Sequence, residues 1–281
     1  MAILAYLSGL LYIAAAFLLF LVGKIAYDFQ LRRVNLNAEL FERDNLALAL
    51  ALSGYFLGLT LAVGGALAGT APSLAKGLLS TLGYGLIAIV LLNVSSRLND
   101  WLILTRCDLE KEIVTDRNCG VGLVAAANHV AVGLILYGVI SGEGGGLMAL
   151  LIFWALGQAT LILAAKVYDL ITPFRLSEVI EQGNVAVGAA LAGVLVALGN
   201  IIRFAVQGKL DSWSQSLASF AVVVVLGLIL LPLVRLATDW LILPGHSLTH
   251  EEVGQEVPNI GAGVIEGSIY ISISFLIGWC F

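Results

Sequence analysis

Residues 45–75 read NLALALALSGYFLGLTLAVGGALAGTAPSLA and contain no Asp, Glu, Lys or Arg. This run is longer than the roughly 20 apolar residues that one helix needs to cross a bilayer. Backbone polar groups must be paired inside hydrocarbon, so such a segment crosses as a helix; a barrel would show shorter, alternating segments. Six further runs of at least 20 residues lack charge in the same way: 1–23, 77–96, 118–142, 144–165, 182–202 and 212–234.

The final span needs a further argument. Residues 267–281 are uncharged but too few to cross about 30 Å of hydrocarbon. Extension back to Asn259 gives a full span and places Glu266 inside the membrane. Residues 1–22 lack the positive start of a secretory signal, so they count as a span as well. We therefore predict an all-α, polytopic integral membrane protein with eight transmembrane helices, in agreement with a mean hydropathy of +1.00.

One polar pattern recurs four times, each time between one apolar helix and the next. A Lys or Arg is followed three or four positions later by Asp beside an aromatic residue, then by Glu, and then by an Asn that opens a segment rich in small residues. Because a repeated two-helix unit enters the membrane each time from the same side, the pattern predicts four hairpins of equal orientation. The four copies are Lys24, Asp28, Glu39 and Asn45; Arg97, Asp100, Glu112 and Asn118; Lys166, Asp169, Glu178 and Asn184; and Arg235, Asp239, Glu251 and Asn259.

A longer repeat joins these hairpins in pairs. NDWLIL at 99–104 recurs as TDWLIL at 238–243. We therefore predict two four-helix membrane repeats of the same orientation, residues 1–143 and 144–281, with a weaker four-fold repeat of hairpins. The second helix of each hairpin is rich in small residues, which let helix backbones approach closely in lipid. We expect these four helices to form an inner ring.

The distribution of Lys and Arg predicts the orientation, because cytoplasmic loops carry the excess of these residues. Lys76, Arg203 and Lys209 lie on one side, and the other eleven lie on the opposite side. We therefore predict a multi-pass protein of the bacterial inner (plasma) membrane with both termini on the non-cytoplasmic side. The eleven are Lys24, Arg32, Arg33, Arg43, Arg97, Arg106, Lys111, Arg117, Lys166, Arg175 and Arg235.

The acidic loop that leads into an Asn and a small-residue helix carries a family resemblance. It reads RDNLALALALSG at 43–54 and GNVAVGAALAG at 183–193. The chain resembles the YjfL-like bacterial inner-membrane proteins, the domain of unknown function 350 family, with the short two-helix domain in tandem copies along nearly the whole chain. The resemblance implies a polytopic inner-membrane protein and supplies no activity.

The cation–Asp pairs lie one helical turn apart, so the members of each pair share a helix face. They either anchor the helices among lipid headgroups or form a charged ring around a cytoplasmic vestibule. The pairs are Lys24 with Asp28, Arg97 with Asp100, Lys166 with Asp169, and Arg235 with Asp239.

The four Asn residues that open the second helices are predicted to be N-caps, since an Asn side chain accepts a hydrogen bond from an otherwise unpaired backbone N–H. If the helix starts converged, their dipoles would also favour an anion, although the nearby Glu residues oppose this. The four are Asn45, Asn118, Asn184 and Asn259.

Glu266 is the sharpest single candidate, because a carboxylate inside a membrane is costly and is a functional hypothesis by default. It is either a functional group or a protonated Glu hydrogen-bonded within the bundle. Asn128 and His129 add to this candidate intramembrane polar site. No His, Cys or acidic cluster has metal spacing, so we expect no metal and no cofactor. The net charge of −5 implies no nucleic-acid partner.

Two functions follow as hypotheses, and the absence of a catalytic constellation predicts that the chain is not an enzyme. The first is a transport-class protein, a conduit for a small ion or solute lined by Glu266 and the polar residues of 77–96 and 118–142. The second is a structural or interaction protein that anchors cytoplasmic partners through four exposed, Glu-containing loops, a hypothesis favoured because no helix shows a full polar stripe. The partners expected are the lipid bilayer, a small ion or solute, and a peripheral cytoplasmic protein or further copies of the chain.

Overall fold

The computed structural model describes residues 2–31, 34–69, 72–104, 108, 110–142 and 144–280, without the side chains of 2–6 and Asp100. Across these residues the chain forms helices and contains no β-strand. Arg32, Arg33, Arg106 and Cys107, four of the predicted loop residues, lie outside the described part.

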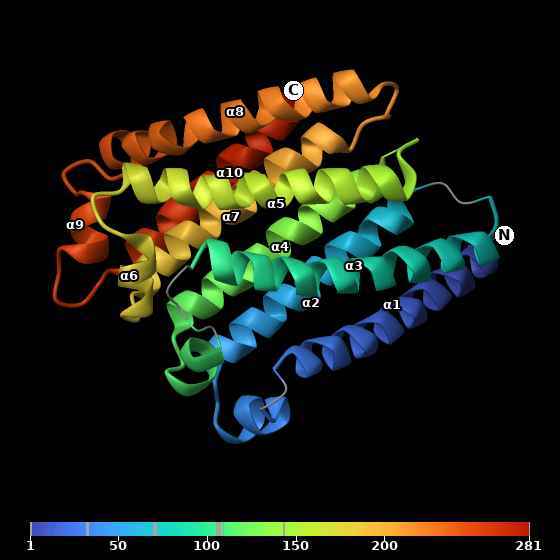
Figure 1. Ribbon diagram of the computed structural model, residues 1–281, viewed down its shortest axis with the longest axis horizontal. Helices are drawn as coiled ribbons and strands as arrows, with labels where there is room; N and C mark the ends of the chain where they lie inside the picture. Colours follow the sequence, from blue (N-terminus) through green and yellow to red (C-terminus); the bar gives the residue numbers. More distant parts are fainter. Residues whose placement is uncertain are drawn as a thin grey trace.

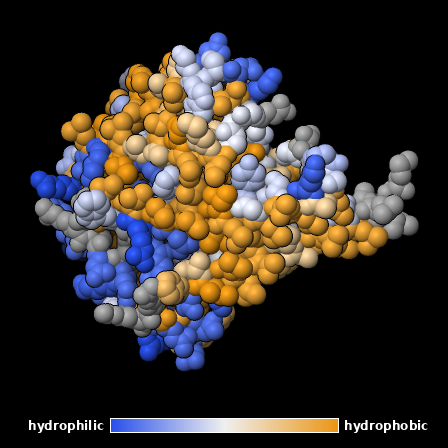
Figure 2. Space-filling model, turned by 45° about the vertical axis from the view of Figure 1, so that its right-hand side comes forward, coloured by the Kyte–Doolittle hydropathy of each residue, from blue (hydrophilic) through white to orange (hydrophobic). Residues whose placement is uncertain are grey.

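Eight of the described helices are long and apolar enough to cross a membrane, which confirms the all-α prediction and the number of spans. Figure 2 shows the resulting surface, a broad hydrophobic band with hydrophilic residues gathered mainly beyond one edge of it. The spanning helices are α1 (Ala2–Gln30), α2 (Leu46–Ala68), α3 (Leu74–Leu102), α4 (Cys119–Ser141), α5 (Gly146–Ile171), α7 (Val185–Val206), α8 (Trp213–Ala237) and α10 (Ile260–Cys280).

Short helices fill the loops that lead into α2, α4, α7 and α10. Figure 1 shows them along one side of the molecule, at the lower left, while the tighter connections lie at the opposite ends of the helices. One further short helix, η3 (Thr238–Ile242), prolongs α8. The loop helices are η1 (Ala38–Glu42), η2 (Lys111–Thr115), α6 (Leu176–Glu181) and α9 (Leu248–Val253).

The helices that open with the repeated Asn form a row, not the inner ring expected from the sequence. α2 packs on α4, α4 on α7 and α7 on α10, so that α2 and α10 lie at the two ends of the row (Figure 1). Small residues hold the row together. A Cβ on Gly54 of α2 would overlap Ala126 of α4, and a Cβ on Gly193 of α7 would overlap Gly267 of α10. Neighbouring backbones therefore touch, as small-residue packing in lipid allows.

The remaining spans, α1, α3, α5 and α8, form a second layer over this row. α3 contacts α2 and α4, α5 contacts α4 and α7, and α8 contacts α7 and α10. α3, α5 and α8 thus each cover a groove between two helices of the row, whereas α1 packs on α2 and α3. α4 and α7 become the core of the molecule, with α7 the most buried of the eight spans among the described residues.

Candidate functional site

A charged cluster lies buried in the second half of the chain, towards the end that carries the loop helices. Glu266 of α10 has no exposed surface, and Arg235, near the end of α8, is 6% exposed. The Arg235 Nη1 atom lies 2.6 and 2.7 Å from the two carboxylate oxygens of Glu266. Tyr168 of α5 donates its hydroxyl hydrogen to Glu266 Oε1 at 2.8 Å. Three spanning helices therefore meet at one ion pair.

A second carboxyl group joins the cluster from the loop side. Glu252 of α9 is fully buried and lies 3.0 Å from Arg235 Nη2 through its Oε2 atom. Its other oxygen has no hydrogen-bond partner among the described residues. One guanidinium thus faces two carboxyl groups, and full ionisation would leave an uncompensated negative charge away from water, which is costly.

The energetics of burial place a proton on Glu252. Burial, and then the nearby carboxyl group of Glu266, raise the pKa of Glu252 to about 9, against the opposing attraction of Arg235. With one proton held at Glu252, one guanidinium and the two carboxyl groups leave the cluster without net charge at neutral pH. Loss of the proton from Glu252 would therefore give this buried cluster a net negative charge.

Polar groups continue from this cluster along one face of α10. Glu266, Tyr270 and Ser274 are spaced four apart and all are buried. They span about 12 Å at the helical rise. Tyr270 donates to the carbonyl oxygen of Leu231 at 2.8 Å, and the Asn200 amide of α7 donates to the Ser274 hydroxyl at 3.0 Å. This stripe is present in the sequence as a spacing of four, but Tyr270 and Ser274 resemble ordinary packing residues and were missed.

The other two intramembrane candidates lie elsewhere. Asn128 and His129 belong to α4, which is separated from α10 by α7 (Figure 1). The Asn99 amide of α3 donates to the Asn128 oxygen, while the His129 ring packs against Tyr55 with centroids 5.3 Å apart. The structure therefore does not bring Glu266 together with Asn128 and His129.

Among the side chains that the structure describes, the cation–Asp positions form no ring of ion pairs. Lys24 donates to Asn37 at 3.1 Å, and Arg235 turns inward to Glu266 and Glu252. Within the described side chains, no ion pair joins Lys24 to Asp28, Lys166 to Asp169 or Arg235 to Asp239. Arg97 is exposed, and its predicted partner Asp100 lies outside the described side chains.

Two of these Asp residues instead support the loop helices. Asp169 accepts the backbone N–H of Leu176 at 2.7 Å, at the start of α6. Asp239 accepts the backbone N–H of Leu248, also at 2.7 Å, at the start of α9. An acceptor at a helix start satisfies a backbone donor that has no partner inside the helix. Asp239 therefore holds the helix that carries Glu252.

All four repeated Asn side chains accept backbone hydrogen bonds at their helix starts. The oxygens of Asn45, Asn118, Asn184 and Asn259 receive N–H groups at 3.0 to 3.3 Å. The amide groups of the first three also reach into the loop of the following hairpin: Asn45 to the carbonyl of Ile113 at 2.9 Å, Asn118 to that of Ile180 at 2.7 Å, and Asn184 to that of Glu252 at 2.8 Å. Each of these three caps thus ties its own hairpin to the next.

The loop glutamates are less available to partners than the sequence suggested. Glu39 and Glu112 are only 4% and 3% exposed, because both turn inward at the starts of α2 and α4. Glu112 accepts the side-chain amide of Asn118 at 2.9 Å. The expectation of four exposed Glu-containing loops is therefore wrong for these two residues; Glu181, in contrast, is exposed.

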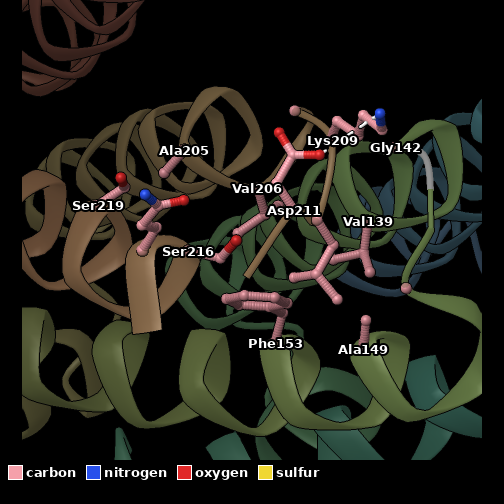
Figure 3. A pocket seen from close by; sticks show the side chains of 14 residues that line it. Val139, Gly142, Ala149, Phe153, Ala205, Val206, Lys209, Asp211, Ser216 and Ser219 are labelled. Atoms are coloured by element: carbon pink, nitrogen blue, oxygen red, sulfur yellow. Dashed lines mark ion pairs between the residues drawn. The ribbon is translucent and has the colours of Figure 1, made fainter. Parts of the chain in front are cut away.

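A pocket lies at the other ends of the helices, where α4, α5, α7 and α8 meet (Figure 3). Its volume is about 200 Å³, room for several water molecules of about 30 Å³ each. Lys209 and Asp211 form an ion pair of 3.4 Å at this pocket. Phe153 lines it from α5, and Ser216 and Ser219 line it from α8. The second half therefore has polar surface at both ends and polar residues between them.

The fold and the buried cluster define a multi-pass α-helical membrane protein. The chain belongs to the family described as Domain of Unknown Function (DUF350), whose model matches it twice, at residues 1–140 and 143–281. A UPF0719 transmembrane protein of Aquifex aeolicus (strain VF5) is 22% identical over 249 residues, which cover 87% of this chain and 89% of that protein. No solved structure gives a significant match.

Proposed function

We propose that this chain is a transport-class protein whose second half binds and transfers a proton, and that it is not an enzyme. The observation that carries the proposal is the arrangement of two buried carboxyl groups, Glu252 and Glu266, around the single cation Arg235. Such a site needs one proton to be neutral, and intramembrane ionisable residues commonly mark ion pathways and proton relays.

The route we propose runs between α7, α8 and α10. It begins at the Lys209–Asp211 pocket, passes the Asn200–Ser274 hydrogen bond and Tyr270, and ends at Glu266 and Glu252 next to α9. Hydroxyl and carboxyl groups both donate and accept hydrogen bonds, so they suit a relay. Backbone contacts close all three seams of the row, α2–α4, α4–α7 and α7–α10. The buried polar residues of α10, and not a gap in the row, favour a route through the second half.

The orientation we propose follows the excess of Lys and Arg on the side of the loop helices. It places α9 and Glu252 at the cytoplasmic side of the inner membrane and both termini on the other side. In this arrangement the pocket with Lys209 and Asp211 opens to the outside. The relay then connects the two aqueous phases.

Proton flux into liposomes that contain the purified protein tests the proposal. With a pH-sensitive dye inside and an imposed pH gradient, we expect Glu266→Gln to abolish the protein-dependent flux. One carboxyl group and one guanidinium neutralise each other without a proton, so the site would no longer need one. Ser274→Ala should slow the flux, whereas Ser272→Ala, an exposed serine on the same helix, should leave it unchanged.

Two outcomes would count against the proposal. Equal flux in the wild type and in Glu266→Gln would remove the cluster from the mechanism. Wild-type flux no greater than that of protein-free liposomes would contradict proton transfer and favour the anchoring hypothesis. Pull-down of cytoplasmic partners with the wild type and with the charge-reversed loop variant Glu181→Lys tests that hypothesis.

A further inference from the structure

α10, the last helix of the row, exposes a face whose equivalents on α2, α4 and α7 pack against the next helix. At two, nine and thirteen positions after its cap Asn, each helix of the row carries three small residues, which we name the leading face. On α2, α4 and α7 these residues are buried, and on α10 the equivalent three are exposed. The leading faces are Ala47, Gly54 and Gly58; Gly120, Ala127 and Ala131; Ala186, Gly193 and Ala197; and, exposed on α10, Gly261, Ser268 and Ser272.

The other end of the row carries the complementary surface. At four, eight and fifteen positions after the cap, each helix has a second set of small residues, which we name the trailing face. On α4, α7 and α10 this face packs on the helix before it, while on α2 Ser53 and Thr60 are exposed and Ala49 is half-buried. The trailing faces are Ala49, Ser53 and Thr60; Gly122, Ala126 and Gly133; Gly188, Ala192 and Gly199; and Gly263, Gly267 and Ser274.

Contacts inside the row follow one register. Position nine of one helix meets position eight of the next, as Gly54 meets Ala126 and Gly193 meets Gly267. Position two likewise meets position four, as Ala186 meets Gly263. In this register, the next contact in the series would join Ser268 at the end of the row to Ser53 at its beginning.

Within the described part of the chain, the cap of α10, the last helix of the row, lacks the hydrogen bond to a following loop that the other caps make. A side-chain amide nitrogen has two hydrogens to donate. Asn118 uses both, to Glu112 of its own loop and to the carbonyl of Ile180 in the following loop. Asn259 is exposed and donates to Glu251 of its own loop at 2.9 Å. Among the described residues, the Asn259 amide reaches no loop of another hairpin. The position in η1 that corresponds to Ile113 is Leu40.

The second layer is incomplete at the same edge. α3, α5 and α8 each cover a groove between two helices of the row, whereas the described part of α1 packs mainly on α3 and, within the row, on α2. α1 is also the least buried of the eight spans in the described part of the chain. A helix placed against the trailing face of α2 would give α1 the second neighbour that the other three have.

We propose that copies of this chain associate head to tail, with the leading face of α10 against the trailing face of α2 in the next copy. The amide of Asn259 would then donate to the backbone carbonyl of Leu40 in that neighbouring copy. Small residues permit the close approach that drives helix association in lipid. All helices of the row run in the same direction, so both copies keep one membrane orientation. The contact uses two different surfaces and closes into a ring when the rotation between copies allows it.

Disulfide cross-linking in native membranes tests the proposal. In a background with Cys107, Cys119 and Cys280 replaced by Ser, differently tagged chains carrying Ser268→Cys and Ser53→Cys are produced together and oxidised. We expect a strong cross-link between the two tags, and closed or ladder-like products from one chain that carries both substitutions. As the matched control, a chain with Ser268→Cys is produced together with a chain that carries Val90→Cys, an exposed position in the middle of the second layer. This pair should give only background cross-linking.

The outcomes separate this contact from the alternatives. Efficient cross-linking of Ser268→Cys to itself would show a symmetric α10–α10 contact and overturn the head-to-tail arrangement, as would the absence of any product above the control. Because the substituted side chains face away from the rest of their own chain, both variants should fold, which thermal unfolding in detergent checks. Proton flux does not enter this readout, so the inference and the proposed function can fail separately.

Discussion

Replacement of Arg235 by Met should destabilise the protein more than any other change in the buried cluster. It leaves Glu266 and Glu252 in a site closed to water without their shared cation, and removes contacts of 2.6, 2.7 and 3.0 Å. Loss of one partner from a buried ion pair costs about 3–5 kcal/mol. Protonation of both carboxyl groups would reduce this cost at low pH.

The two carboxyl groups should respond unequally to amide substitution. In Glu266→Gln the guanidinium keeps Glu252, which then ionises, so we expect a loss of about 1.5–3 kcal/mol, the range for a hydrogen bond to a charged group. Glu252→Gln removes a carboxyl group that already holds a proton, so the loss should be about 1 kcal/mol or less. The expected order of stability is therefore Glu252→Gln, then Glu266→Gln, then Arg235→Met.

Reversible unfolding by dodecyl sulfate in mixed micelles, followed by the fluorescence of the five Trp residues, measures these differences. An alanine or methionine substitution at the exposed Lys166, which has the same type of charge, is the control and should change little. If Glu252→Gln proved as damaging as Arg235→Met, Glu252 would have to be an ionised partner of the guanidinium, and the proton assignment would fail.

The stability of the folded protein should decrease as the pH rises. The folded-state pKa of Glu252, about 9, lies above its unfolded value of 4.5. The folded protein therefore binds the extra proton between these values, and stability falls as pH rises, because the slope follows the protons bound by the unfolded minus the folded state. Between about pH 6 and pH 8 the wild type should lose up to about 1.4 kcal/mol per pH unit relative to Glu252→Gln. Parallel curves for the two proteins would refute the assignment.

Three further predictions concern the packing, the caps and the topology. Gly193→Leu should cost at least about 1–3 kcal/mol by overpacking against α10, while Gly83→Leu, with open space around it, should stay within about 0.5 kcal/mol; equal unfolding curves would refute the close contact. Asn118→Ala should cost about 1–2 kcal/mol through loss of the cap and of its bond to the next loop, measured by the same unfolding. Cysteines placed at Asn35 and Glu181 should react with an impermeant thiol reagent from the same side, and labelling from opposite sides would end the common orientation of the hairpins.

Local sequence was sufficient for the features that depend on one segment at a time. Uncharged runs identify the eight spans because a helix must satisfy its backbone within itself in hydrocarbon. Asn45 and its three equivalents are recognisable as caps because the bonds they accept come from residues two or three positions away. The acidic loop and the small-residue helix also indicated the family, whose model matches both halves.

Spacing along the chain predicts the wrong partner where a side chain can reach more than one. Arg235 and Asp239 share a helix face, yet the guanidinium turns to Glu266 and Glu252, 31 and 17 residues away. Asp239 instead caps α9. The spacing shows which residues share a face but not which neighbouring helix covers that face, and a covered guanidinium takes the carboxylates that the neighbour supplies.

The chain alone thus determined its membrane class, its spans and its caps, because each depends on the hydrophobicity and backbone bonding of a continuous segment. Only the tertiary structure decided that the small-residue helices form a row, that Tyr168, Arg235, Glu252 and Glu266 meet, and that the two ends of the row remain uncovered. These features arise from contacts between helices far apart in sequence, and small residues permit close approach without specifying which partner makes it.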